Sequence, residues 1–192
     1  MDIFSAIMER RSVRSYVDRP IPRETLEAIM QAALMAPSAV DLQPWYFVVV
    51  ESAEAFVRLK EIMDEVGDEV RPTLAKRFPD YPDLVRKSCG FIKSLGNAPV
   101  CVLAFQYKAD YQKSQSSMVQ SVSAAIENMI LAAWEMGVGS CWISAPIETG
   151  LDKKLQQTFA PDKGEFVAMI TLGYPEKIPN MPKRKEGRVR YV

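Results

Sequence analysis

The stretch Ala98–Phe105 constrains the fold of this chain more than any other feature, because it is short, apolar and almost free of polar alternation. An alternating strand buries one face, whereas a continuous apolar run predicts a strand buried on both faces. Its eight residues also fall far below the length of a membrane-crossing helix, which needs roughly 20 residues. We therefore expect this strand to lie in a buried central layer of a mixed α and β fold, and no transmembrane segment.

Three further short apolar segments are expected to join this sheet, namely Trp45–Val50, Ser140–Ser144 and Phe166–Leu172. The last residues, Arg188–Val192, alternate like an edge strand. The segment before them is kept extended by its prolines, at positions 175, 179 and 182. Such a strand needs a sheet edge, and we expect it to pair with the edge of a partner subunit. A loose tail is the alternative.

Apolar residues at helical spacing predict helices between these strands. The most apolar one covers Met118–Met136 and ends at Gly137. Its apolar positions, expected to be buried, are Val119, Val122, Ile126, Met129, Ile130, Ala133 and Trp134. A short helix is capped by Asp2 and has Ile3, Ala6 and Ile7 on one face, and a longer one starts at Pro22 with the apolar stripe Leu26, Ile29, Met30, Ala33 and Leu34. Ser52 caps a further helix with the stripe Phe56, Leu59, Ile62 and Met63. The last helix is expected over about residues 149–159. Residues 65–97 are undecided and are interpreted as a possible helical insertion.

Composition excludes several classes of function. Lysine plus arginine and aspartate plus glutamate both number 24, so the net charge is zero and no nucleic-acid-binding surface is expected. Histidine is absent, which excludes Ser-His-Asp and Cys-His triads and histidine-ligated metals. No glycine-rich Rossmann or P-loop motif occurs. We expect no metal site.

The chain is expected to form a single domain over residues 1–192, with residues 174–192 as an extended C-terminal tail that clasps a partner. The first twenty residues carry seven charged side chains, so we expect no signal peptide and a cytoplasmic protein. Cys89, Cys101 and Cys141 lack CxxC spacing and are interpreted as reduced structural residues.

Two basic segments at opposite ends of the chain are suited to hold a phosphate group. They are Arg10-Arg11-Ser12-Val13-Arg14 and Lys183-Arg184-Lys185. Arginine offers a planar fork of donors to phosphate oxygens, lysine a compact charge and serine a hydroxyl. We expect one pocket to unite them around a nucleotide cofactor. Solvated surface charge is the alternative for either segment alone.

A series of motifs resembles the FMN-dependent nitroreductase family. It runs in order from Arg10-Arg11-Ser12-Val13-Arg14 through Ala36-Pro37-Ser38-Ala39, Gln43-Pro44-Trp45 and Gly137-Val138-Gly139 to Pro146-Ile147-Glu148 and the basic tail. The resemblance implies an α+β fold with a mixed, largely antiparallel central sheet flanked by helices. It also implies an intertwined homodimer with two FMN sites at the interface, each built from both subunits.

Carried over residue by residue, the resemblance implies a set of cofactor-binding positions. They are Arg10, Arg11, Ser12 and Arg14 for the ribityl phosphate and the pyrimidine edge, Pro37, Ser38, Ala39, Asp41 and Gln43 in a loop from the other subunit, Pro146, Ile147 and Glu148 against the flavin ring, and Lys183, Arg184 and Lys185 as a phosphate clamp. Asp41 departs from the family, where asparagine is common, and Thr149 stands where some relatives have glycine. An aspartate there removes two donors and adds a negative charge.

The expected function is an FMN-dependent oxidoreductase that works by ping-pong hydride transfer. NADH or NADPH reduces the flavin, and an electron-poor small molecule such as a nitroaromatic or a quinone then takes the same place. The flavin carries the chemistry, so no catalytic acid or base is assigned. Arg10 or Arg14 would stabilise negative charge on the reduced flavin.

Three other interpretations stay open. The first is other flavin chemistry of the same superfamily, namely enone reduction, dehalogenation or flavin destruction. The second is a flavin-binding redox module without turnover, and the third is an anion-binding dimer without flavin. Residues 65–97, which contain Phe78, Tyr81 and Phe91, are either a lid that selects the acceptor or ordinary packing.

Overall fold

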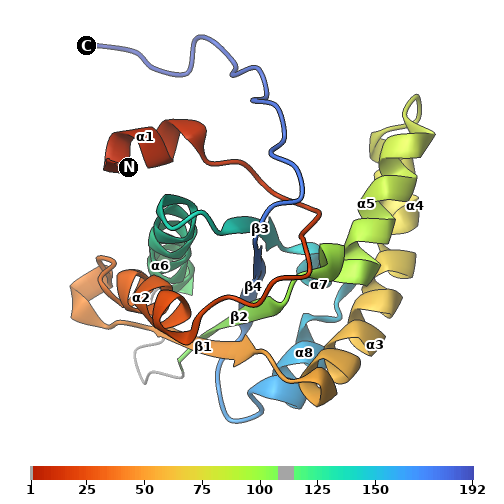
Figure 1. Cartoon of the computed structure of the whole chain (residues 1–192), viewed down its shortest axis with the longest axis horizontal. Coiled ribbons are helices and arrows are strands. Elements are labelled where there is room, and N and C mark those ends of the chain that lie inside the picture. Colours follow the sequence, from red (N-terminus) through yellow and green to blue (C-terminus); the bar gives the residue numbers. More distant parts are fainter. Residues whose placement is uncertain (1, 108–114) are drawn as a thin grey trace.

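The computed structural model describes residues 2–107 and 115–192 (Figure 1). Its centre is a four-stranded sheet in the order β1-β2-β4-β3, in which every neighbouring pair is antiparallel. The strands are β1 (Trp45–Val50), β2 (Val100–Gln106), β3 (Gly139–Ile143) and β4 (Phe166–Gly173). The four expected internal strands are confirmed, with ends that differ by one or two residues. The expected α+β class with an antiparallel sheet is confirmed as well.

Strand β2 is buried on both faces, as its continuous apolar sequence predicted. Val100, Val102 and Ala104 belong to one core cluster, whereas Cys101, Leu103 and Phe105 belong to the cluster on the opposite face. Because successive side chains of a strand point to opposite faces, one apolar strand serves two cores. The sheet therefore needs a helical layer on each side.

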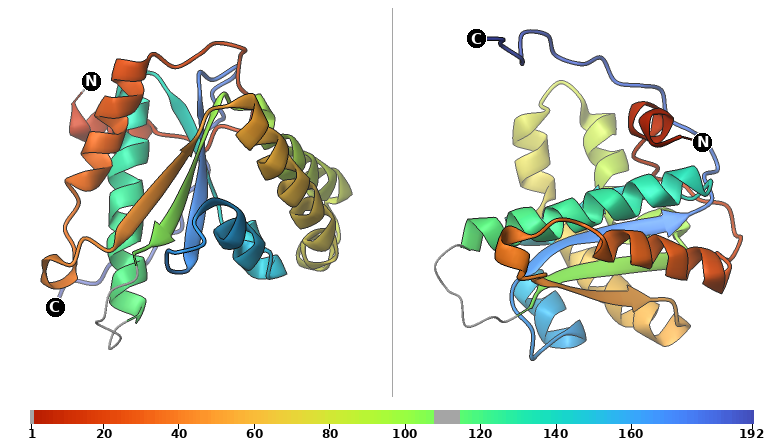
Figure 2. Two further views of the ribbon diagram at one scale, coloured as in Figure 1. Left: turned by 90° about the horizontal axis from the view of Figure 1, so that it is seen from below. Right: turned by 90° about the vertical axis from the view of Figure 1, so that its left-hand side faces the viewer.

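Helices supply both layers (Figure 2). The first face is covered by α2 (Arg23–Leu34) and α6 (Gln115–Glu135), whose buried side chains join the cluster around Val102. The second face is covered by α3 (Ala53–Glu69), α5 (Pro82–Ser94) and α8 (Asp152–Phe159). No helix in residues 2–107 or 115–192 is both long and apolar enough to span a bilayer.

The undecided residues 65–97 form a helical insertion, which confirms that interpretation. Helix α3 continues to Glu69, and α4 (Arg71–Arg77) and α5 follow it as a hairpin. An ion pair of 2.6 Å between Lys93 Nζ and Asp68 Oδ2 joins α5 to α3. The hairpin projects from one side of the sheet (Figure 1).

The N-terminal segment crosses one end of the sheet after α1 (Ile3–Glu9). Gly139 and Gly173 face each other in the register of β3 and β4 and make room for this crossing. A Cβ on Gly139 would lie 2.8 Å from a methyl group of Val13, and one on Gly173 would lie 2.8 Å from the ring of Tyr16. The absence of both side chains lets the segment pack directly on the strands.

One expectation for the helices is confirmed and two are corrected. The helix expected over about residues 149–159 is α8, which begins three residues later, after Gly150 takes a left-handed φ of 73°. The preceding α7 (Ala145–Thr149) is a separate short helix. On α1, Asp2 accepts the expected capping bonds from Phe4 N and Ser5 N, but Ile3 and Ile7 are exposed and only Ala6 is buried. The expected buried positions Leu34 and Val119 are more than one third exposed.

The C-terminal tail leaves the sheet beside the N-terminal segment and runs past α1 (Figure 2). A bridge between Tyr16 and Pro175 fixes its base. Arg188–Val192 form no strand within the single chain, where all five residues are exposed. Pairing with a partner subunit stays a prediction. Two single turns, η1 (Ala39–Asp41) and η2 (Leu95–Asn97), complete the elements of the described chain.

Candidate functional site

Two buried residues anchor the N-terminal basic segment. Val13 N donates to Ser140 O over 2.8 Å, and its side chain is fully buried. The Tyr16 hydroxyl donates to Val13 O and lies 2.7 Å from Thr171 Oγ1, so burial is compensated by hydrogen bonds. Because the segment is extended, the neighbours of Val13 point the other way. Arg14 is accordingly exposed.

The guanidinium groups of this segment bond mainly to the main chain. Arg11 Nη1 donates to Met8 O and Arg10 O over 3.0 and 2.7 Å, and Arg14 Nη1 donates to Ser12 O over 3.2 Å. A carbonyl oxygen carries no formal charge, so these contacts orient the arginines without neutralising them. Within the described residues no ion pair joins these arginines to a carboxylate, and oriented guanidinium groups of this kind suit the binding of an anion.

A cavity of about 210 Å³ opens beside Arg14. Its lining joins Arg14 to Glu148, the side chains from Cys141 to Ala145, and residues of the helical insertion. The insertion contributes Val70, Leu74, Ser88, Phe91 and Ile92. The cavity therefore has an apolar wall from α5 and its neighbours and a polar rim with one cation and one carboxylate. A small molecule with both apolar and polar parts is the kind of ligand that such a lining suits.

Cys141 lies in the wall of this cavity. Burial raises the pKa of its thiol, and the positive charges of Arg14 and Arg10 act in the opposite direction. Burial likewise raises the pKa of the fully buried Cys101 thiol. All three cysteines are free and buried, which agrees with their interpretation as reduced structural residues.

Helix α7 holds the expected Pro146-Ile147-Glu148 segment next to the cavity. Pro146 is buried, whereas Ile147 and Glu148 are exposed. Thr149 Oγ1 donates to Ala145 O and Pro146 O over 3.2 and 3.1 Å, which closes this short helix on itself. The helix thus presents Glu148 on the rim, and the structure brings Glu148 and Arg14 together.

The loop over residues 37–43 is strained and lies outside this cavity. Val40, Asp41 and Gln43 have φ values of 44°, 54° and 46°. Positive φ is unusual for these residues, above all for β-branched valine, and such strain concentrates at functional sites. Side-chain bonds hold the loop, from Gln43 Nε2 to Asp41 Oδ1, from Gln43 N to Ser38 Oγ and from Ala39 N to Ser121 Oγ. Pro37 and Val40 are exposed.

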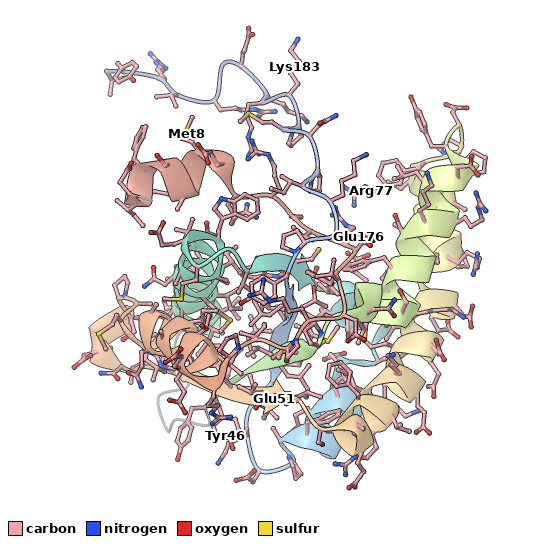
Figure 3. The ribbon with its side chains drawn as sticks, viewed as in Figure 1. Met8, Tyr46, Glu51, Arg77, Glu176 and Lys183 are labelled. Carbon is pink, nitrogen blue, oxygen red and sulfur yellow. The ribbon has the colours of Figure 1, made fainter. Side chains whose placement is uncertain are left out.

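The basic tail segment is not united with the N-terminal one in the single chain. Lys183, Arg184 and Lys185 line a surface hollow with Glu186 that includes no residue of the N-terminal segment. Lys183 stands on the outer side of the tail, beyond Met8 of α1, while Glu176 lies at the tail's base (Figure 3). There Glu176 N donates to Ser15 O, and the Ser15 hydroxyl donates to the Glu176 carboxylate. The expectation of one shared pocket does not hold within one subunit.

Sequence reasoning missed most of the cavity wall. Ser88, Ile92, Val70 and Leu74 reach the cavity only because α3, α4 and α5 pack together. Phe91 was expected only as part of a lid or of ordinary packing. The amphipathic pattern of α5 was the one available signal, and it indicates a buried face without indicating what that face meets.

Comparison with known proteins identifies the family. The family model described as Nitroreductase family matches residues 7–174. The chain belongs to the nitroreductase family. A protein of Methanothermobacter thermautotrophicus, named as a candidate NADH dehydrogenase/NAD(P)H nitroreductase, is 32% identical over 93% of this chain and 80% of its own length. Iodotyrosine deiodinase 1 of Rattus norvegicus is 26% identical over 96% of this chain and 66% of its own length.

Solved structures of this family have the same fold. A BluB-like flavoprotein from Clostridium difficile has a TM-score of 0.77 and 26% identity, covering 100% of this chain and 99% of that one. A nitroreductase with bound FMN from Bacteroides fragilis has a TM-score of 0.75 and 24% identity, with coverage of 100% and 99%. The α+β arrangement of this nitroreductase-family chain is thus that of flavoproteins.

Proposed function

We propose that this chain is an FMN-dependent oxidoreductase that takes hydride from NADH or NADPH and passes it to an electron-poor small molecule, such as a nitroaromatic or a quinone. The observation that carries the proposal is the cavity where Arg14 and Glu148 meet beside the arginine-rich segment. Family membership and the FMN bound to the similar Bacteroides fragilis structure support it.

The residues around the cavity fit a flavin phosphate ester. Arg14 lines the cavity and bonds to a carbonyl oxygen, so its positive charge is available for an anion, and Arg11 bonds to carbonyl oxygens of the same segment. Arg10, Ser12 and the basic tail are the further candidates for the phosphate, and the apolar wall around Leu74 and Ile92 suits the ring. The strained loop with Pro37, Ser38, Ala39, Asp41 and Gln43 is assigned to the cofactor of the partner subunit.

When bound, FMN accepts and donates the hydride, and this is the chemistry that the protein itself lacks. The chain's own contribution is positioning and electrostatics. Arg14, which lines the cavity, would place positive charge beside a bound flavin, where negative charge develops during the reaction, and this would favour the transfer. The wall formed by Val70, Leu74 and Ile92 excludes water from one side of the cavity. No dedicated acid or base is assigned.

We also infer a homodimer with shared sites. The surface around α1 is unusually apolar, since Ile3, Phe4, Ile7 and Met8 are all more than half exposed. Beside them runs a groove of about 470 Å³ between α1, α2 and α6, with mostly apolar lining. Contiguous exposed apolar surface marks protein contacts. A second copy would cover this face and give the extended tail, residues 174–192, a sheet edge or a groove to pair with.

A kinetic experiment tests the proposed reaction. With FMN and NADH, initial rates for a nitroaromatic or quinone acceptor should give parallel double-reciprocal lines, the signature of ping-pong transfer. Intersecting lines would contradict the ping-pong order. A folded, FMN-loaded protein that NADH and NADPH fail to reduce in stopped flow would overturn the enzyme function and support a redox module without turnover.

Reductive dehalogenation of a phenol is the second candidate. It is favoured by the similarity to iodotyrosine deiodinase over 96% of this chain, together with a helical insertion that walls the cavity. An acceptor series that includes a halotyrosine, a nitroaromatic and a quinone decides between the two. A specificity constant at least tenfold higher for the halotyrosine would favour dehalogenation.

A further inference from the structure

An unusual left-handed turn joins the cavity wall to the sheet. Leu95, Gly96 and Asn97 take φ values of 56°, 63° and 59° between the end of α5 and the start of β2. Consecutive left-handed residues are unfavourable for L-amino acids, so contacts must hold such a turn. Leu95 is fully buried, and Ser94 Oγ accepts a hydrogen bond from Gly96 N. The turn is therefore a fixed junction.

This junction lies against the backbone of Arg14. Tyr16 N donates to Gly96 O over 3.1 Å. A Cβ on Gly96 would lie 2.5 Å from Arg14 O and 2.9 Å from Arg14 C, which is closer than any side-chain carbon can approach. Glycine is required at residue 96 both for its φ and for this contact. Any side chain there must displace Arg14 or the end of α5.

The last turns of α5 also contact the charged end of Arg14. The guanidinium carbon lies 5.8 Å from the centroid of the Phe91 ring, within the range of a cation–π interaction. The adjacent Val13 is bonded to Ser140 of β3. Arg14 is thus held between β3 on one side and the end of α5 on the other, at its backbone and at its side chain.

We propose that Gly96 and Phe91 are positioning residues for Arg14. Gly96 sets the place of the Arg14 backbone, and Phe91 sets the direction of the guanidinium group beside the cavity. Because Phe91 also belongs to the apolar wall, a shift of α5 would move the wall and the charge together. The consequence for cofactor binding rests on the proposed function, whereas the positioning itself does not.

The first test compares two glycines, one at the contact and one away from it. Gly96→Ala should speed hydrogen exchange of the Tyr16 amide in the cofactor-free protein at least tenfold and weaken FMN binding at least tenfold. Gly90→Ala is the control, because Gly90 is on the exposed surface of α5 and an added Cβ there would meet no atom within 4 Å. It should leave both quantities within twofold. Wild-type exchange and affinity in folded Gly96→Ala would overturn the proposal.

The second test replaces the Phe91 ring, which does not strain the backbone. It tests the role of Phe91 even if Gly96→Ala does not fold. Phe91→Leu should weaken binding of reduced FMN about tenfold more than binding of oxidised FMN, which lowers the two-electron potential by about 30 mV. Phe91→Tyr keeps the ring and should shift the potential less than a third as far. An unchanged potential in Phe91→Leu would overturn the role of Phe91.

The two tests separate this inference from the proposed function. If the wild-type chain binds no FMN, the proposed function fails, and exchange of the Tyr16 amide in Gly96→Ala still decides whether Gly96 positions the Arg14 backbone. Faster exchange in Gly96→Ala supports that role, and wild-type exchange overturns it. If FMN binds and only the variants differ, the positioning stands, and the stopped-flow reduction by NADH or NADPH decides the proposed function separately.

Discussion

The two basic segments of the chain have similar charge and very different surroundings. Val13 and Tyr16 hold the N-terminal segment against β3 and β4 by burial and hydrogen bonds. Lys183, Arg184 and Lys185 are exposed residues of an extended tail whose described anchor, at Pro175 and Glu176, is several residues away. The N-terminal segment is positioned by contacts within its own subunit, whereas the C-terminal segment belongs to a tail that is fixed only at its start.

This difference indicates that positive charge alone is not sufficient to form an anion-binding site. A guanidinium that is already oriented loses little conformational entropy when it binds, whereas a lysine on an exposed, extended tail must be ordered first. We therefore expect the N-terminal segment to dominate cofactor affinity in each subunit. The tail is expected to contribute through the partner subunit and through weaker, screened contacts with the phosphate.

The largest expected effect is that of Arg14→Ala. Loss of one charge-assisted hydrogen bond costs about 1.5–3 kcal/mol, equivalent to roughly a 10- to 150-fold weaker FMN affinity. Quenching of FMN fluorescence on titration with protein measures it. Arg86→Ala is a matched control, because Arg86 pairs with Asp83 on the exposed side of α5. Equal affinity of Arg14→Ala and wild type would remove Arg14 from the site.

Deletion of Arg188–Val192 tests whether the C-terminal tail contributes to dimerisation. If the tail pairs with a partner subunit, its loss should raise the dimer dissociation constant about tenfold, since a contribution of about 1.4 kcal/mol corresponds to that factor. Sedimentation equilibrium over a concentration series measures it. A dimer of unchanged stability would show that these residues do not clasp the partner.

The double variant Lys183→Ala/Lys185→Ala should have a smaller effect than Arg14→Ala. Exposed lysines contribute about 1 kcal/mol or less and are screened by salt, so FMN affinity should fall severalfold at low salt and less at high salt. The same fluorescence titration at two ionic strengths reports it. A loss larger than that of Arg14→Ala would reverse the comparison between the two segments.

The smallest expected effect concerns Tyr16, the anchor of the N-terminal segment. Burial raises the pKa of Tyr16 well above its ordinary value of 10.0. Below that pH both states keep the proton and stability is unaffected, but above it the unfolded chain ionises first and stability falls as pH rises. Tyr16→Phe should therefore flatten the loss of stability above pH 10.0, at the cost of about 1 kcal/mol at neutral pH.

Urea unfolding on both sides of that ordinary value measures the prediction for Tyr16. Tyr81→Phe is a suitable control, since Tyr81 is 62% exposed. If Tyr16→Phe and wild type lose stability in parallel at high pH, ionisation of Tyr16 does not contribute to the alkaline limit.

Much of the fold could be predicted because local patterns determined it. The continuous apolar run before Gln106 specified a strand with two buried faces, and Ser52 and Asp2 marked helix starts by capping chemistry. The separate short helix α7 was missed because five residues that end at Gly150 give only a weak helical signal. The exposed face of α1 was missed because a helical stripe predicts burial without naming the partner surface.

The candidate site was predictable in its charged residues and not in its wall. Arg14 and Glu148 were expected from motifs and do meet at one cavity. Ser88 and Ile92 line the cavity only because the helices of the insertion pack together. The contact that holds the Arg14 backbone depends on the left-handed turn at Gly96. Such contacts depend on how distant segments cross, which periodicity and composition do not encode.

The visible spectrum of the purified protein reconstituted with FMN tests the central claim most directly. It should be recorded without oxygen before and after stoichiometric NADH, and then NADPH. We predict flavin bands at one FMN per chain that bleach with at least one nicotinamide, and lower FMN retention in Arg14→Ala. A folded protein that stays colourless after reconstitution would contradict the assignment of the cavity to FMN.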